Sequence, residues 1–289
     1  MFLNTLTKDE LYYSLASVFS TNERTVRDYI INEADNIVNN SYRDFTIDSL
    51  DLTTLKRACN CNELKAIEFI TVNHITPREN VELLMHENIM TLPHALTRNT
   101  ALSIYLKGKG FDFKYVNNRI HMKKDEKEVD FSKLHFSNLL MRLGGENTFN
   151  DFNVNGYLFA NSFHIEECRG WLGSPEILKS LSNAFADKHI ADDYANRCNN
   201  YLISFRVPIE SIDIECYDAN ISTAEKTNIL VKYSINALAH YEVKSSIRKE
   251  FYNPIIMLKR DYDVPYENIM KLWRFDYINA KLIPIELTE

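Results

Sequence analysis

The sequence predicts an α+β protein in which a helical N-terminal region precedes a mostly antiparallel sheet. Two observations lead to this prediction. Residues 67–75 gather β-branched and aromatic side chains into one short run, which is typical of a buried strand. Residues 1–64 instead show apolar side chains at helical spacing behind three capping signals. We therefore expect a helical region over residues 1–64 and an α+β domain over residues 65–289.

Three start signals define the predicted N-terminal helices. Thr7 and Glu10 have the spacing of a capping box, in which each side chain satisfies a backbone donor of the other residue. A second start is expected at Ser20 or Thr21, and Asp51 is positioned to cap a third, short helix. Nothing in this region carries chemistry. A packing role is the simplest interpretation, and recognition of a partner is the alternative.

Composition and charge narrow the class of protein. The 33 Lys and Arg residues against 40 Asp and Glu residues give a formal charge of −7, which argues against a broadly basic surface but leaves room for a local basic groove. No apolar run reaches the length of a membrane span, and the N-terminus lacks a signal-peptide layout, so we expect a cytoplasmic protein without a membrane partner. The absence of phosphate-loop, GxSxG and HExxH patterns argues against common nucleotide hydrolases, serine hydrolases and zinc enzymes.

The cysteine pattern predicts free thiols. The chain has 5 cysteines, an odd number, and they are scattered. Cys59 and Cys61 flank a single residue, which is too close for an ordinary disulfide and unlike a zinc-binding pair. We expect reduced cysteines in the cytoplasm and no metal site.

The stretch that begins at residue 67 is the most informative part of the chain. His74 stands near the end of the predicted strand and is followed by Thr76 and Pro77. Pro77 can begin a helix, because the first helical position needs no backbone donor. The apolar face of that helix would consist of Val81, Leu84, Met85 and Ile89. His74 is then either a structural histidine in a tight turn or a ligand-holding residue at a strand end, and the local features leave both open.

The rest of the chain alternates between predicted helices and strands. Asn117 and Asn118 tolerate the positive φ of a tight turn, which predicts a hairpin over residues 113–122. An aromatic strand over residues 154–163 would expose Tyr157, Phe159 and Asn161 on one face. Helices are predicted over residues 102–106, 131–143, 176–194 and 223–239. Strands are predicted over residues 201–215, where Pro208 would break the pairing, and over residues 283–285, and residues 255–258 form a further apolar run.

Read together, these stretches resemble the ADP-ribosyltransferase superfamily, most nearly its bacterial toxin and phage-defence branches. The family has a strand that ends in His-x-Thr with an Asn shortly after it, matched by His74, Thr76 and Asn80. An aromatic strand follows, matched around Tyr157, and then a hydrophobic-x-Val-Pro strand, matched by residues 205–208. The family's late Glu-Val strand start is matched by Glu242 and residue 243. Two departures stand out: His240 replaces the first residue of a Glu-x-Glu pair, and Asn88 stands where a glycine is common.

The resemblance implies a fold, a reaction and a site. The fold would be a split, mostly antiparallel sheet, and the reaction would be mono-ADP-ribosylation: transfer of ADP-ribose from NAD to a macromolecular acceptor, protein or nucleic acid, without a metal. Glu242 would be the catalytic carboxylate, which stabilises positive charge at the ribose. His74, Thr76 and Asn80 would hold NAD, and Tyr157 would lie against the nicotinamide ring. Candidates for pyrophosphate contact are Arg78, Arg98 and Arg142.

The same resemblance suggests a toxin or an antiviral defence protein, with an antitoxin or regulatory protein as a possible partner. Two alternatives stay open. The chain could be a non-catalytic interaction protein, or an antitoxin-like partner, on a degenerate version of the fold. It could also be an NAD glycohydrolase, which shares the pocket and uses water as the acceptor. Convergence of His74, Tyr157 and Glu242 on one cleft would separate enzyme from scaffold, and an acceptor assay would separate transfer from hydrolysis.

Overall fold

Strand β2 (Phe69–Arg78) lies in the middle of the larger of two sheets. The computed structural model describes residues 1–41, 46–133, 137–144, 151–160, 172–243, 252–276 and 281–285. Within these residues the larger sheet has eight strands; seven follow the order β11–β10–β7–β2–β6–β9–β8, and β1 pairs with β2. Its other strands are β1 (Phe2–Leu3), β6 (Asn155–Tyr157), β7 (Asn199–Pro208), β8 (Ile212–Ile214), β9 (Ile255–Leu258), β10 (Ile269–Asp276) and β11 (Lys281–Ile285).

The predicted α+β class and mostly antiparallel sheet are confirmed. The pairs β2–β6, β6–β9, β8–β9 and β10–β11 are antiparallel, and β1 pairs with β2 in parallel. The contacts divide the chain into two compact units. The first unit comprises Met1–Asn73, Asn155–Phe163 and Ser204–Leu258, and the second comprises His74–Val154, His164–Ile203 and Lys259–Glu289.

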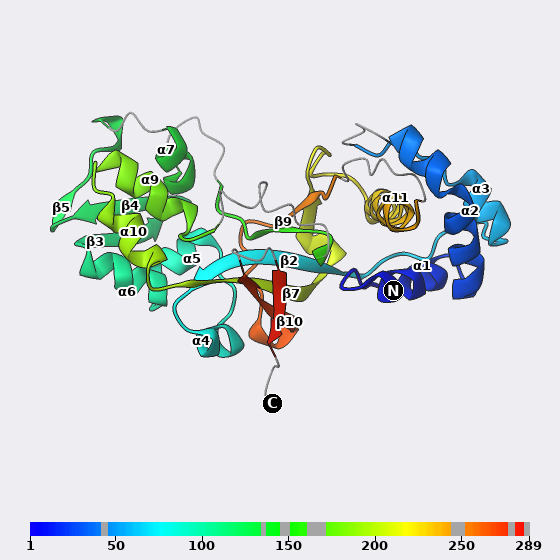
Figure 1. Ribbon diagram of the computed structural model, residues 1–289. Coiled ribbons are helices and arrows are strands. Elements are labelled where there is room, and N and C mark those ends of the chain that lie inside the picture. Colours follow the sequence, from blue (N-terminus) through cyan, green and yellow to red (C-terminus); the bar gives the residue numbers. More distant parts are fainter. Residues whose placement is uncertain are drawn as a thin grey trace. The chain divides into compact units, whose positions relative to one another are not determined.

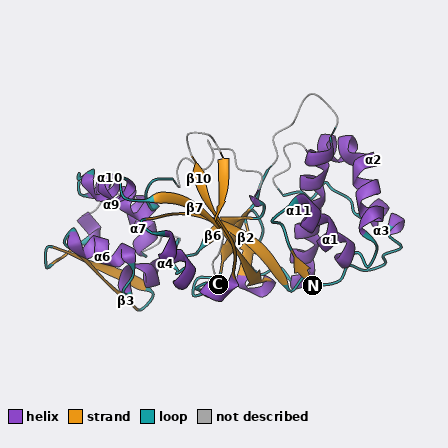
Figure 2. Cartoon of the chain, turned by 60° about the horizontal axis from the view of Figure 1, so that its bottom comes forward, coloured by secondary structure: helices purple, strands orange, loops and turns teal. Residues whose placement is uncertain are grey.

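The helices of the first unit pack around one another. They are α1 (Lys8–Val18), α2 (Glu23–Ser41), α3 (Thr53–Ala58) and the long α11 (Thr223–Glu242). Helix α11 lies beside both α1 and α2, as two views show (Figures 1 and 2). Because it is covered on several sides, α11 buries residues all around its axis, and this distinguishes it from an amphipathic surface helix.

Side chains cap the first two of these helices. The Thr7 hydroxyl accepts a hydrogen bond from the backbone of Glu10 at 3.2 Å, so Thr7 caps α1, and the Glu10 carboxylate accepts from the Thr7 hydroxyl at 2.8 Å. The apolar face behind it, Leu11, Leu15 and Val18, is buried. Helix α2 begins slightly later than predicted, because its cap is Asn22 rather than Ser20 or Thr21. The Asn22 side chain accepts a hydrogen bond from the backbone N–H of Thr25 at 2.9 Å.

The second unit is built on a small sheet of three strands, β3 (Phe111–Val116), β4 (Arg119–Lys124) and β5 (Lys127–Glu128). The helices of this unit are α4 (Val81–His86), α5 (Leu92–Thr97), α6 (Ala101–Gly108), α7 (Ser137–Leu143), α9 (Glu176–Ala184) and α10 (His189–Ala195). The inner face of β3 and β4 contributes Phe111, Phe113, Ile120 and Met122 to a core that α6, α7, α9 and α10 complete. The predicted hairpin is confirmed: Asn117 and Asn118 adopt φ angles of 51° and 61°.

Two strands differ in length from the prediction. Strand β2 continues past Pro77, so the helix expected there is wrong at its start. Helix α4 begins at Val81 instead, where the Asn80 side chain accepts a hydrogen bond from the Glu82 backbone at 2.8 Å. The predicted aromatic strand ends at Tyr157, and Asn161 lies outside the described residues.

Side chains and backbone angles determine where several of these elements end. The Asn253 side chain binds both the N–H and the carbonyl of Phe159, and this replaces strand pairing after β6. A positive φ of 51° at Ala186 splits the predicted helix of residues 176–194 into α9 and α10. The strand of residues 201–215 breaks after Pro208 into β7 and β8, as the proline predicts. Strand β10 was not predicted at all. Among the described residues, no helix combines the length and the apolar character that crossing a membrane requires.

Candidate functional site

A row of paired residues crosses the sheet of the first unit. Asn73 of β2 pairs with Tyr157 of β6, and Tyr157 pairs in turn with Ile255 of β9. The row continues to Glu215, just after β8, whose backbone N–H donates to the carbonyl of Ile255 at 3.0 Å. Directly paired residues point to the same face of a sheet, so Asn73, Tyr157 and Glu215 belong to one face. Tyr157 and Glu215 are two strands apart, or roughly 10 Å.

Asn73 fixes the middle of this row. Its side chain is fully buried, and its amide nitrogen donates to the carbonyls of Tyr157 at 3.2 Å and Leu158 at 3.0 Å. Its amide oxygen accepts a hydrogen bond from Ser204 of β7. One asparagine thus joins three strands, which gives the Tyr157 backbone a defined position. The sequence offered no sign of this role, because an asparagine within an apolar run is typical of neither a core nor a site.

A glycine lets β6 approach β2 closely. A Cβ atom on Gly156 would lie 2.6 Å from Cγ1 of Val72 and 2.8 Å from the carbonyl oxygen of Asn73. Only glycine fits such an approach without displacement of the neighbouring strand. Gly156 therefore holds the adjacent Tyr157 against β2, and Tyr157 is 6% exposed.

A tyrosine holds the carboxylate at the other end of the row. The Tyr252 hydroxyl donates to a carboxylate oxygen of Glu215 at 2.6 Å, and the backbone N–H of Ile255 reaches the same oxygen at 3.4 Å. Burial, followed by the hydrogen bond to Glu215, raises the pKa of Tyr252 well above its usual range, so Tyr252 stays a neutral donor. The Tyr233 ring of α11 lies 6.3 Å from the Tyr252 ring, centroid to centroid. Glu215 is half-buried.

Glu242 stands at the end of a helix rather than at the start of a strand. It is the last residue of α11, and the expectation of a Glu-Val strand start is wrong because the helix continues three residues beyond its predicted end. Its carboxylate lies 2.7 Å from the ammonium of Lys8 and accepts a hydrogen bond from Tyr12 at 3.0 Å. The Glu242 side chain is 16% exposed. These contacts join α11 to α1.

The other predicted NAD-binding residues follow one another along β2 and α4 in the second unit. His74 is half-buried in β2, and the buried hydroxyl of Thr76 accepts a hydrogen bond from Arg78. Asn80 is exposed and opens α4 through its contact with Glu82. His74 belongs to the second unit, whereas Tyr157 and Glu242 belong to the first. Convergence of these three residues on one pocket stays a prediction.

Two of the three candidate pyrophosphate-binding arginines are held in ion pairs. Arg142 is buried, and its guanidinium binds Glu176 and lies 3.3 Å from Asp151. Arg98 lies 2.9 Å from the carboxylate of Asp263. Arg78 donates to the Pro77 carbonyl at 3.0 Å as well as to Thr76.

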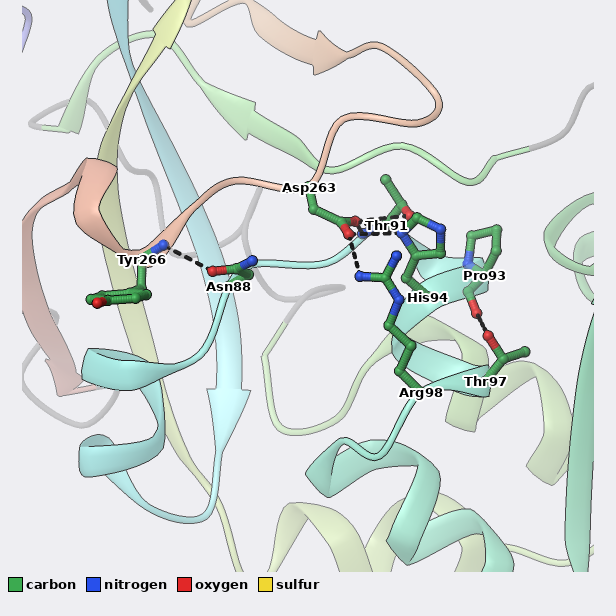
Figure 3. A network of polar contacts seen from close by, with 8 residues as sticks. All are labelled: Asn88, Thr91, Pro93, His94, Thr97, Arg98, Asp263 and Tyr266. Atoms are coloured by element: carbon green, nitrogen blue, oxygen red, sulfur yellow. Dashed lines mark hydrogen bonds and ion pairs between the residues drawn. The ribbon is translucent and has the colours of Figure 1, made fainter.

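A second polar cluster, which the sequence did not predict, lies in the second unit around Asp263 (Figure 3). One carboxylate oxygen accepts from the backbone of Thr91 at 2.9 Å and from its hydroxyl at 3.2 Å. Nδ1 of His94 lies 2.7 Å from the other oxygen, which also accepts from Arg98 at 2.9 Å. Asp263 thus ties the segment before β10 to the start of α5. Its partners are 165 or more positions away in the chain, so no local motif could have indicated it.

The described cysteines are free thiols: Cys59, Cys61, Cys198 and Cys216. Cys168 lies outside the described residues. The described part of the chain contains no group of three His, Cys, Asp or Glu side chains that could hold a metal ion.

Comparisons with protein-family models, with curated proteins and with solved structures found no match to this chain.

Proposed function

We propose that this chain binds NAD, cleaves the bond between nicotinamide and ribose, and transfers ADP-ribose to a macromolecular acceptor. The observation that supports this proposal most is the pairing of Asn73 with Tyr157, which joins the aromatic strand β6 to the strand that carries His74 and Thr76. The resemblance leads one to expect this neighbourhood of an aromatic strand and a His-x-Thr strand. In the proposal, Tyr157 lies against the nicotinamide ring, and His74, Thr76 and Asn80 hold NAD.

The reaction needs a carboxylate near the ribose carbon, because positive charge develops there as nicotinamide leaves. Two glutamates are candidates. Glu242 is the counterpart by resemblance, and its carboxylate already binds Lys8 and Tyr12. Glu215 is favoured by register, because it belongs to the same row and the same sheet face as Tyr157. We therefore propose Glu215 as the first carboxylate to test and Glu242 as the second.

The test measures nicotinamide release and NAD affinity for the parent protein, Glu215→Gln and Glu242→Gln. Each substitution keeps the shape of the side chain and removes its charge. Loss of the reacting carboxylate should lower the rate about 10²–10³-fold and change NAD affinity much less, since the ground state needs the charge less than the transition state. Protein, RNA and DNA pools incubated with labelled NAD would identify the acceptor, and turnover without any acceptor would indicate a glycohydrolase.

A non-catalytic interaction protein, or antitoxin-like partner, is the second candidate function. The observation that favours it is the double contact of Glu242 with Lys8 and Tyr12, which gives this carboxylate a structural role between two helices. Under this alternative, the parent protein neither binds NAD nor releases nicotinamide with any acceptor pool. Calorimetric titration of NAD into the full chain separates the two functions before any activity is sought.

A further inference from the structure

The polar cluster around Asp263 holds a histidine by one ring nitrogen and leaves its other nitrogen for a ligand. Asp263 accepts from the backbone and the hydroxyl of Thr91, and its Oδ2 lies 2.7 Å from Nδ1 of His94 and 2.9 Å from a guanidinium nitrogen of Arg98 (Figure 3). A carboxylate that accepts all of these contacts places the proton of a neutral imidazole on Nδ1. The lone pair of His94 therefore lies on Nε2.

Nε2 of His94 is the atom of the cluster that the fold does not use. Every contact of the His94 ring with the described residues runs from Nδ1 to Asp263. The His94 side chain is 24% exposed, whereas the carboxylate behind it is only 15% exposed. A buried carboxylate that fixes the tautomer and the orientation of an accessible imidazole is the arrangement that makes the imidazole an effective general base.

Arg98 brings hydrogen-bond donors beside this base. Its backbone N–H donates to the carbonyl of His94 at 2.9 Å, so the two residues lie one helical turn apart. The Arg98 side chain is 49% exposed, and among the described residues Nη1 alone of its three nitrogens has a side-chain partner, the Asp263 carboxylate. The ion pair offsets the charge of Arg98, so its value to a ligand lies in the planar fork of the remaining donors, which matches two oxygens of one phosphate.

We propose that His94 and Arg98, positioned by Asp263, cleave RNA by attack of the 2′-hydroxyl on the adjacent phosphate. RNA suits these groups because it carries its nucleophile next to the phosphate, so the reaction needs a base for the hydroxyl and donors for the phosphate oxygens. Asp263 acts through His94 and is a positioning residue. This inference does not rest on the proposed reaction with NAD.

The proposed step moves one proton and exchanges one bond at phosphorus. Nε2 of His94 takes the proton of the 2′-hydroxyl as the 2′-oxygen bonds to phosphorus, and the bond between phosphorus and the 5′-oxygen breaks. Donors of Arg98 hold the phosphate oxygens while negative charge builds on them. The 5′-oxygen takes a proton from water, and the imidazolium returns its proton to the hydroxide that forms. The products are a 2′,3′-cyclic phosphate and a 5′-hydroxyl.

The test incubates the full chain, without NAD, with a short labelled RNA strand and with a DNA strand of the same sequence. The RNA should be cut and the DNA left intact, and mass spectrometry should find the cyclic phosphate. The main variant is His94→Asn, because the amide nitrogen takes the place of Nδ1 and keeps a donor for Asp263 while Nε2 is lost. The rate should fall about 10²–10⁴-fold. The matched control is His86→Gln, which changes an exposed histidine of the same unit and should keep the parental rate.

Two further variants separate chemistry from folding. His94→Ala should regain part of its lost rate when free imidazole is added, which a loss of structure does not allow. Arg98→Lys keeps the positive charge and removes the planar fork, so its rate should fall at least about tenfold. Thermal melts of all variants identify any that do not fold, and rescue of His94→Ala then decides the role of His94.

Each outcome decides the inference. Loss of cleavage in His94→Asn, with rescue of His94→Ala by imidazole and a parental rate for His86→Gln, would support it. Intact RNA after incubation with the parent would overturn it, and so would equal cleavage of the DNA strand, because that reaction has no 2′-hydroxyl. Cleavage by His94→Asn at the parental rate would assign the activity to a contaminating nuclease and would also overturn it.

Discussion

The hydroxyl of Tyr12 donates a hydrogen bond to Glu242 over 3.0 Å, although 230 positions separate these residues in the chain. The Lys8 ammonium lies 2.7 Å from the same carboxylate oxygen, and the Arg27 guanidinium lies over the Tyr12 ring, 4.1 Å from its centroid. Burial, followed by the hydrogen bond to Glu242, raises the pKa of Tyr12 well above its usual range. Tyr12 therefore stays a neutral donor, and the end of α11 is attached to α1 by directional contacts.

This contact predicts that Tyr12→Phe destabilises the protein. Tyr12 is fully buried, and the substitution removes one hydrogen bond to a carboxylate while the ring stays in place. A hydrogen bond to a charged group contributes about 1.5–3 kcal/mol, so the melting temperature should fall by several degrees. Tyr13→Phe is the matched control, because the neighbouring ring on the same helix is 69% exposed and should change nothing. Equal melting temperatures of parent and Tyr12→Phe would show that the contact does not form in solution.

Gly156→Ala should destabilise the first unit for a steric reason. The new methyl group would lie 2.6 Å from Val72 and 2.8 Å from the Asn73 backbone, so β2 and β6 would have to separate. Overpacking of this kind typically costs about 1–3 kcal/mol. Gly108→Ala is the control, because a Cβ there meets nothing within 4 Å and Ala favours a helix. Urea unfolding should give a lower midpoint for Gly156→Ala and an equal or higher midpoint for Gly108→Ala. The opposite order would contradict the close approach of the two strands.

Asp263→Asn should lower the stability of the second unit. An amide keeps the size of the side chain, but it removes the negative charge beside His94 and Arg98. The Asp263 side chain is 15% exposed, so its ion pairs are only partly screened by solvent. We expect a loss of about 2 kcal/mol, seen as a lower urea midpoint. Asp261→Asn changes an exposed carboxyl two residues away and serves as the control. Identical midpoints for the two variants would show that the cluster does not stabilise the fold.

Local signals predicted the parts of the fold that local forces determine. The Thr7 cap of α1 and the turn at Asn117 and Asn118 both depend on residues close in sequence, and the structure confirms them. The early end of the aromatic strand, by contrast, depends on a distant residue. The Asn253 side chain, 94 positions from Phe159 in the sequence, ends the pairing of β6. The periodicity of apolar residues cannot predict such a contact.

The candidate site shows the same limit. The resemblance identified Tyr157 and the strand of His74, and the register shows that these two strands are neighbours. It could not identify Asn73 or Tyr252, because their roles depend on contacts 84 and 37 positions away. A segment of mixed propensity around Glu242 was assigned to a strand, but packing of α11 against α1 and α2 extends the helix through it.

The free cysteines should differ strongly in their reactivity. Burial raises the pKa of the Cys59 thiol to about 11, and burial likewise raises the pKa of Cys198 to about 11. Near pH 8 such groups are only about 0.1% thiolate, and the thiolate is the reactive form. Cys216 is exposed, so of the four described cysteines it should be alkylated first in a brief iodoacetamide pulse followed by peptide mass spectrometry. While the pH is below the pKa of Cys59, each increase of one pH unit should raise its alkylation rate about tenfold. Among the described cysteines, Cys216→Ser should abolish the fast reaction and leave the slow sites unchanged. Melting curves with and without reductant should coincide. Labelling of Cys59 as fast as Cys216 would show that the α3 region opens far more readily than its packing implies.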